Sequence, residues 1–144
     1  MNKKFICYCG LYCENCPVKA KVEPAAKHLY DEMKKAGFES FINQIPGSEG
    51  FWPFLTQLAE NGMCISCQDG SGNPNCEVRN CAKEKGIDIC AQCDSYPCEK
   101  FNAFFEGYSV LKNDNEFFRT KGIDEWAKLQ DERRLRGFTY SDEK

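Results

Sequence analysis

The residues best suited to chemistry in this sequence are its cysteines, of which there are 11 among 144 residues. Such a content is typical of a disulfide scaffold in a secreted chain or of metal ligation in a chain kept reduced. The N-terminus has a basic start but no apolar stretch as long as that of a signal peptide, so we expect the chain to be cytoplasmic. An odd number of cysteines also leaves one thiol outside any closed set of disulfides. The composition therefore favours metal–thiolate sites, with zinc as the expected metal.

A central set of cysteines carries the strongest signal. Its members are Cys64, Cys67, Cys76, Cys81, Cys90, Cys93 and Cys98. Zinc–sulfur bonds of about 2.3 Å in tetrahedral geometry place two sulfurs roughly 3.8 Å apart, which a tight turn with two intervening residues spans. The pairs Cys64/Cys67 and Cys90/Cys93 therefore predict one closed four-sulfur zinc site. In the alternative grouping the ligands follow the chain, from Cys64 to Cys81 in one site and from Cys90 to Cys98 in another, and spacing does not decide between the two.

A second set lies at the N-terminus and comprises Cys7, Cys9, Cys13 and Cys16. The last three, followed by Pro17, have the spacing that radical S-adenosylmethionine enzymes use to hold an iron–sulfur cluster. This chain is short for the barrel of such an enzyme, but a [4Fe–4S] cluster completed by a fourth thiol is an alternative to zinc. We expect these three cysteines to bind metal with Cys98 as the fourth ligand, and Cys7 to pack beside Phe5 as the unpaired residue.

Two cysteines, Cys76 and Cys98, fall at the expected starts of helices, where free amides and the helix dipole favour the thiolate. Such thiols suit nucleophilic chemistry as well as ligation, so a thiol redox or metal-handling protein is a second interpretation. The single histidine, His28, lies inside an expected helix, and we expect it to be no ligand. The sequence contains neither a Ser-His-Asp set nor a glycine-rich phosphate loop, and it gives little support for an enzyme.

Helical spacing of apolar residues, with Pro at helix starts and Gly at helix ends, predicts the elements that position these cysteines. The expected helices cover residues 24–36, 50–61, 76–85, 98–106, 109–121 and 124–136, with Asn75 as the cap of the third. We expect Leu29, Phe101 and Trp126 on the inner faces of their helices, and an apolar stripe on the second helix. That stripe comprises Phe51, Phe54, Leu55 and Leu58.

These elements predict a mainly α fold of about five or six short helices around cysteine-rich metal-binding knuckles, with little strand. We expect one domain over residues 1–144. Its knuckle region is expected at about 62–100 and its helical C-terminal part at about 100–137.

The formal net charge of −3 gives no basic surplus for binding a phosphate backbone. The basic run from Arg133 to Arg136 is accompanied by Asp131 and Glu132, and we expect it to be a solvated face. No apolar run approaches the roughly 18 residues of a membrane helix. We therefore expect a protein partner or a small molecule rather than nucleic acid or a membrane, and the oligomeric state stays open.

Two motifs in particular give the chain a family resemblance. They are Cys9-Gly10-Leu11-Tyr12-Cys13-Glu14-Asn15-Cys16-Pro17 and Cys90-x2-Cys93-x2-Tyr96-Pro97-Cys98. With a Trp-containing helix near the C-terminus, they resemble the DUF3795 family of small bacterial and archaeal proteins, over the span from Cys9 to about Asp142. The resemblance implies a cysteine-rich, zinc-binding domain and no particular substrate. We interpret the chain as a zinc-binding domain in which the metal is mainly structural and the role is that of a binding module.

Overall fold

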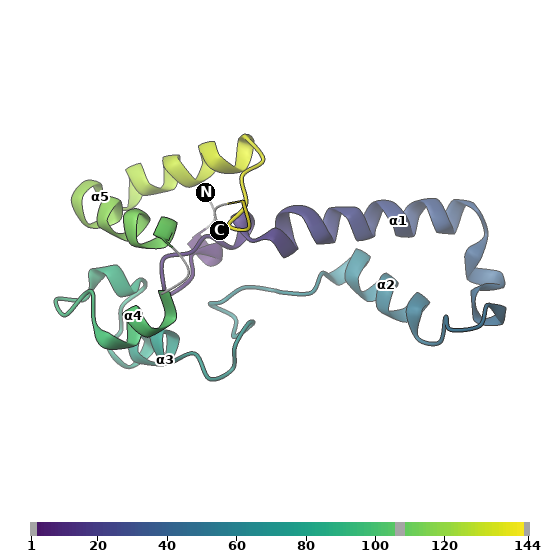
Figure 1. The fold of residues 1–144 in the computed structure, drawn as a ribbon, viewed down its shortest axis with the longest axis horizontal. Helices are drawn as coiled ribbons and strands as arrows, with labels where there is room; N and C mark the ends of the chain where they lie inside the picture. The colour runs from purple at the N-terminus through teal and green to yellow at the C-terminus, as the bar shows by residue number, and fades with distance from the viewer. Residues whose placement is uncertain (1–2, 106–108, 143–144) are drawn as a thin grey trace. The chain divides into compact units, whose positions relative to one another are not determined.

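The computed structural model describes residues 3–105 and 109–142, and the side chains of all of these except residues 104 and 105. The described residues form helices and loops, with one isolated antiparallel bridge between Ile6 and Tyr12. The α-helices are α1 (Glu23–Lys35), α2 (Phe51–Asn61), α3 (Glu77–Glu84), α4 (Glu99–Phe105) and α5 (Ser109–Leu135) (Figure 1). Short helical turns, such as Cys13–Asn15 and Cys90–Gln92, connect them. The prediction of a mainly α fold is confirmed.

The expected break between the two C-terminal helices is present inside α5. Gly122 has φ of 81° and ψ of 177°, so the main chain leaves the helical conformation at that residue and changes direction (Figure 1). A left-handed φ of this kind favours glycine because it has no Cβ. The prediction that Asn75 caps the third helix is wrong: Cys76 is the N-cap of α3, and the Asn75 amide donates to the side chain of Asn73.

The chain forms two compact units, one of residues Pro17–Cys64 and one of Met1–Cys16 with Ile65–Lys144. The prediction of one domain over residues 1–144 stays a prediction. In the unit Pro17–Cys64, α1 and α2 pack through a small apolar core, and the rings of Tyr30 and Trp52 stack at 5.3 Å between centroids.

The expected inner faces of α1 and α2 are wrong in part. Leu29 is 46% exposed and Phe54 is 59% exposed, whereas Tyr30 and Leu55, each one residue further on, are buried. Successive residues in a helix point about 100° apart, so burying one of two adjacent apolar residues turns the other away from the core. Tyr30 and Leu55 occupy the interface, which leaves Leu29 and Phe54 at the surface.

In the other unit, α5 packs against the turns Cys13–Asn15 and Cys90–Gln92. Trp126 is fully buried and meets Tyr12 edge to face at 6.1 Å between ring centroids. Phe101 is also buried, so the predicted inner positions of Trp126 and Phe101 are confirmed. The helix therefore holds a part of the N-terminal cysteine segment and a part of the central one within the same unit.

A buried polar network strengthens this attachment. Asn15 Nδ2 donates to Gln130 Oε1 at 2.9 Å, and Gln130 Nε2 donates to Asp114 Oδ2 at 2.8 Å. Arg133 Nη1 lies 2.6 Å from the same carboxylate oxygen, and the Asp114 side chain is only 1% exposed. The expectation that the whole basic run from Arg133 to Arg136 is solvated is therefore wrong at its first residue, because the buried carboxylate requires a charged partner.

Candidate metal centre

Four cysteines from three chain segments line one small cavity. They are Cys81 in α3, Cys90 and Cys93 at the two ends of a 3-10 turn, and Cys98 directly before α4. The cavity has a volume of about 20 Å³, and a single water-sized sphere needs roughly 10–15 Å³. It has room for one ion and none for an organic substrate.

Two consecutive turns position the thiols of Cys90 and Cys93. The amide of Cys93 donates to the carbonyl of Cys90 at 3.0 Å, and the amide of Tyr96 donates to the carbonyl of Cys93 at 3.1 Å. The Gln92 side chain braces the first turn by accepting hydrogen bonds from the amides of Asp88 and Ile89, at 3.0 and 3.2 Å. A Cys-x2-Cys pair in such turns presents both sulfurs to one side.

Positive charge lies beside the thiols. Lys85 Nζ lies 3.1 Å from Cys93 Sγ, and Lys100 lines the same cavity. The hydrogen bond from Lys85, together with a main-chain hydrogen bond from Ser95, lowers the pKa of the Cys93 thiol from its ordinary value. Burial, followed by the charges of Cys98, Cys93 and Cys81 and then of Cys9, raises the pKa of the Cys90 thiol to about 12. The four sulfurs are therefore close enough to act on one another electrostatically, and a cation among them would relieve their repulsion.

The donor set fits a zinc ion by its chemistry, since four thiolates are the ligands of many structural zinc sites. Within residues 3–105 and 109–142, no group of three or more Cys, His, Asp or Glu side chains is arranged to hold an ion as it stands. Binding would therefore require the thiols to turn about their side-chain torsions until they face a common centre.

The predicted ligands group differently from either expected arrangement. Cys90 and Cys93 share their cavity with Cys81 and Cys98. The Cys67 thiol interacts with that of Cys7, and Cys64 belongs to the unit Pro17–Cys64. The predicted pairing of Cys64 and Cys67 with Cys90 and Cys93, and the consecutive alternative, stay predictions, but the described contacts favour the four cysteines of the cavity.

Sequence reasoning missed Lys85 as a neighbour of the thiols. The signal was available, because Lys85 follows Cys81 by four residues and such pairs lie on one face of a helix. In the sequence, Lys85 does not differ from an ordinary surface lysine. Only the fold shows that it lies next to Cys93.

The N-terminal cysteines form a second group of thiols. Cys7, Cys9 and Cys13 are buried, and the sulfurs of Cys7 and Cys13 lie 3.4 Å apart. These three residues belong to a buried cluster that also contains Cys90, and Cys67 and Cys76 pack against that cluster. Cys16, although half-buried, is not among the described members of the cluster. Cys7, expected to be the unpaired residue, has its thiol in contact with that of Cys13, and Phe5 packs against the cluster that contains both.

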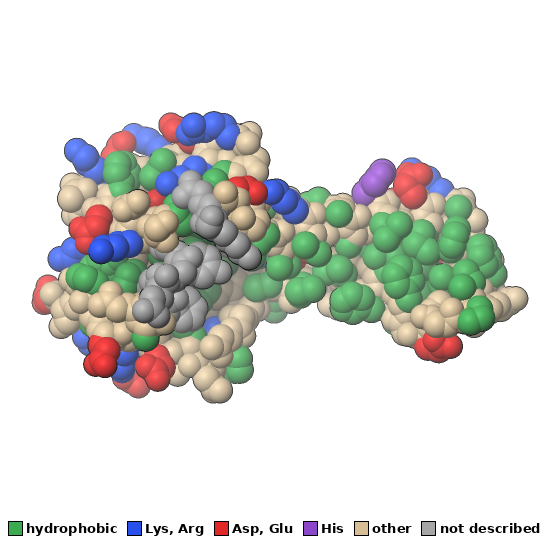
Figure 2. Space-filling view, in the orientation of Figure 1, with side chains coloured by type: hydrophobic (Ala, Val, Ile, Leu, Met, Phe, Trp, Pro, Cys, Tyr) green, Lys and Arg blue, Asp and Glu red, His purple; other side chains and the backbone are tan. Residues whose placement is uncertain are grey.

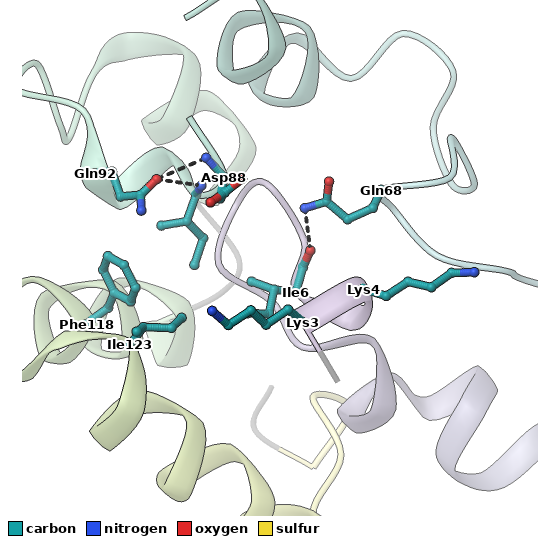
Figure 3. A pocket seen from close by; sticks show the side chains of 9 residues that line it. Lys3, Lys4, Ile6, Gln68, Asp88, Gln92, Phe118 and Ile123 are labelled. Carbon is teal, nitrogen blue, oxygen red and sulfur yellow. Dashed lines mark hydrogen bonds between the residues drawn. The ribbon is translucent and has the colours of Figure 1, made fainter. Parts of the chain in front are cut away.

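A larger pocket of about 420 Å³ lies in the same unit (Figure 3). Its polar groups are largely engaged by the protein itself. Gln68 donates to the carbonyl of Ile6 at 3.0 Å, Gln92 accepts from two amides, and Lys4 pairs with Asp69 at 3.0 Å. The pocket therefore offers few convergent polar groups to orient a ligand, and the thiol cavity is the stronger candidate site.

None of the described helices is both long and apolar enough to cross a membrane.

Comparison with known proteins points to one family. No curated protein and no solved structure matches the chain. The family model described as "Protein of unknown function (DUF3795)" matches residues 5–103, which is more than half of the chain and includes all the cysteines. The match ends before α5, so the helix that carries Trp126 lies beyond it. The chain therefore belongs to the DUF3795 family.

Proposed function

We propose that this protein is a zinc-binding domain in which Cys81, Cys90, Cys93 and Cys98 hold one zinc ion with a structural role, and that its function is to bind a partner. The observation that carries the proposal is the convergence of these four thiols, from three segments, on one ion-sized cavity.

The ligand number supports a structural role. Four thiolates fill all the positions of a tetrahedral zinc ion, whereas catalytic zinc keeps one position for water or substrate. A zinc ion with four thiolates carries a net charge of about −2. Lys85 and Lys100, which line the cavity, supply positive charge next to it.

The position of the site in the fold supports the same role. The ion would join α3, the turn after Ile89 and the start of α4, which are short elements. Binding free energy at a site that the unfolded chain lacks becomes folding free energy. A closed metal site of this kind leaves the activity of the domain to its surfaces.

Exposed apolar side chains support the proposal that the protein binds a partner. In the unit Pro17–Cys64, Val22, Leu29, Phe51 and Phe54 line a groove in which Lys21 is the one charged residue among those described. Hydrophobic side chains also gather on the face of this unit that Figure 2 shows. Contiguous apolar surface of this kind is typical of sites that contact other proteins. We therefore expect a protein partner with apolar side chains rather than a nucleic acid.

The first test is the metal content of protein purified under reducing conditions, with Cys98→Ser as the variant and Cys16→Ser as the control. We expect the wild type and Cys16→Ser to contain the same amount of zinc, and Cys98→Ser to contain about one ion less per chain. A strong chelator should lower the melting temperature of the wild type. Unchanged zinc in Cys98→Ser, or iron with acid-labile sulfide in the wild type, would contradict the proposal.

A further inference from the structure

The second group of thiols joins two parts of the chain that are distant in sequence. Cys7, Cys9 and Cys13 come from the N-terminal loop, and Cys67 comes from the segment that precedes α3. Cys7 is the centre of the group: its sulfur lies 3.4 Å from that of Cys13, and its thiol also interacts with those of Cys67 and Cys9. These residues are separate from the four that line the cavity beside α3.

The spacing of the sulfurs resembles that of ligands on one ion. Two thiolates bound to the same tetrahedral zinc lie roughly 3.8 Å apart, close to the 3.4 Å between Cys7 and Cys13. In a [4Fe–4S] cluster each thiolate binds a different iron, and the sulfurs are therefore further apart. The observed contact favours a single ion over a cluster.

A buried arginine provides charge for such a site. Arg79 is only 5% exposed, and its guanidinium donates to the carbonyls of Ser71 and Asn73 at 2.7 and 2.6 Å. Carbonyls do not neutralise its charge, and an anionic group beside it would do so. The thiol of Cys67 is such a group, because it interacts with both the Arg79 side chain and the Cys7 thiol.

Burial adds to this argument. Cys7, Cys9 and Cys13 are each less than one-tenth exposed. Several thiols buried in contact repel one another once more than one of them ionises. A divalent cation would relieve this repulsion, with release of the remaining thiol protons to solvent.

We propose that Cys7, Cys9, Cys13 and Cys67 form a second metal–thiolate site for one tetrahedral ion of the zinc type, with Arg79 as its counter-charge. This site differs from the expected set of Cys9, Cys13, Cys16 and Cys98. Cys16 is outside it, and Cys7, expected to be the unpaired cysteine, is inside it.

The experiment counts metal on the full chain by native mass spectrometry and elemental analysis, after loading with zinc under reducing conditions. We expect about two zinc ions per chain in the wild type and in Cys16→Ser, and about one in Cys7→Ser and in Cys67→Ser. Cys98→Ser should also retain about one. The double variant Cys67→Ser/Cys98→Ser should retain none, which separates failure of this site from failure of the first.

Loss of a zinc ion in Cys16→Ser with full retention in Cys7→Ser would overturn the assignment. So would a wild type with one zinc that disappears in Cys98→Ser. A mass about 2 Da lower with a Cys7–Cys13 linkage in the reduced, zinc-loaded wild type would also overturn it, because that thiol pair would then be a disulfide.

Cobalt substitution of the wild type keeps the proposal testable if Cys7→Ser does not fold. Two cobalt ions per chain should bind, with thiolate-to-cobalt absorption that doubles in intensity between the first and the second equivalent. Saturation after one equivalent would contradict a second site.

Discussion

Asn115 in α5 lies directly against Gly10 in the N-terminal cysteine loop, and its Nδ2 donates a hydrogen bond to the carbonyl of Cys9 at 2.9 Å. Gly10 has φ of +97°, and a Cβ at this residue would overlap Asn115 Oδ1 and lie 2.8 Å from its Cγ. The contact holds the main chain at Cys9 and Gly10 against α5. This helix lies outside the residues that the family model matches. The position of the buried thiols therefore depends on α5.

Gly10→Ala should destabilise the protein through both the left-handed backbone and the overlap with Asn115. We expect a loss of about 2–4 kcal/mol in the free energy of unfolding, measured with urea. The matched control is Gly137→Ala, where φ is +76° and no atom lies within 4 Å of the new Cβ. That variant should lose only about 1 kcal/mol. Equal losses in the two variants would show that Asn115 does not constrain the loop.

Tyr140→Phe should weaken the attachment of the C-terminal segment to the N-terminal loop. The Tyr140 hydroxyl accepts a hydrogen bond from the Tyr12 amide at 2.8 Å and donates to Gln130 Oε1 at 3.3 Å. Its removal leaves a buried amide without this acceptor, and we expect a cost of about 1–3 kcal/mol in urea unfolding. Tyr8→Phe is a suitable control because Tyr8 is only half-buried. A cost for Tyr140→Phe no larger than that of this control would contradict the role of the hydroxyl.

The same hydroxyl should make stability fall at alkaline pH. Burial raises the pKa of Tyr140 above its ordinary value, because the phenolate would be desolvated. In the unfolded chain the tyrosine pKa is about 10. Below this pH the group contributes fully to the free energy of unfolding, and the contribution is lost as pH rises from there towards the pKa in the folded protein. The unfolding free energy of the wild type should therefore fall more steeply above pH 10 than that of Tyr140→Phe. Parallel profiles for the two proteins between pH 9 and about pH 11 would exclude this contribution.

Lys85→Met should weaken zinc binding at the cavity beside α3 because it removes the cation that lies 3.1 Å from Cys93 Sγ. Changes to groups that surround metal ligands typically cost 10–100-fold in affinity, and we expect a loss of roughly 10-fold in competition with a chromophoric chelator. Lys83→Met is the matched control, since Lys83 lies in the last turn of α3, which Lys85 caps, but over the ring of Tyr8. Equal affinities for the two variants would show that Lys85 has no effect on the ion.

The sequence alone was sufficient for features that depend on neighbouring residues. The helix ends at Gly62 and the break at Gly122 were predicted because a left-handed glycine ends a helix wherever the rest of the chain lies. The burial of Trp126 followed from the periodicity of its helix. The two cysteine motifs were sufficient to predict the family.

Tertiary structure decided which residues meet. Leu29 and Tyr30 are equally plausible inner residues of α1, and the stacking of Tyr30 on Trp52 selects between them. Cysteine spacing predicts pairs within a turn, but it carries no information on which distant segments approach one another. The approach of Cys81 to Cys98, and of Cys7 to Cys67, depends on how α3 packs on α4 and how α4 and the N-terminal loop pack on α5. That packing is set by burial of apolar surface across the whole unit, which no local pattern of residues encodes.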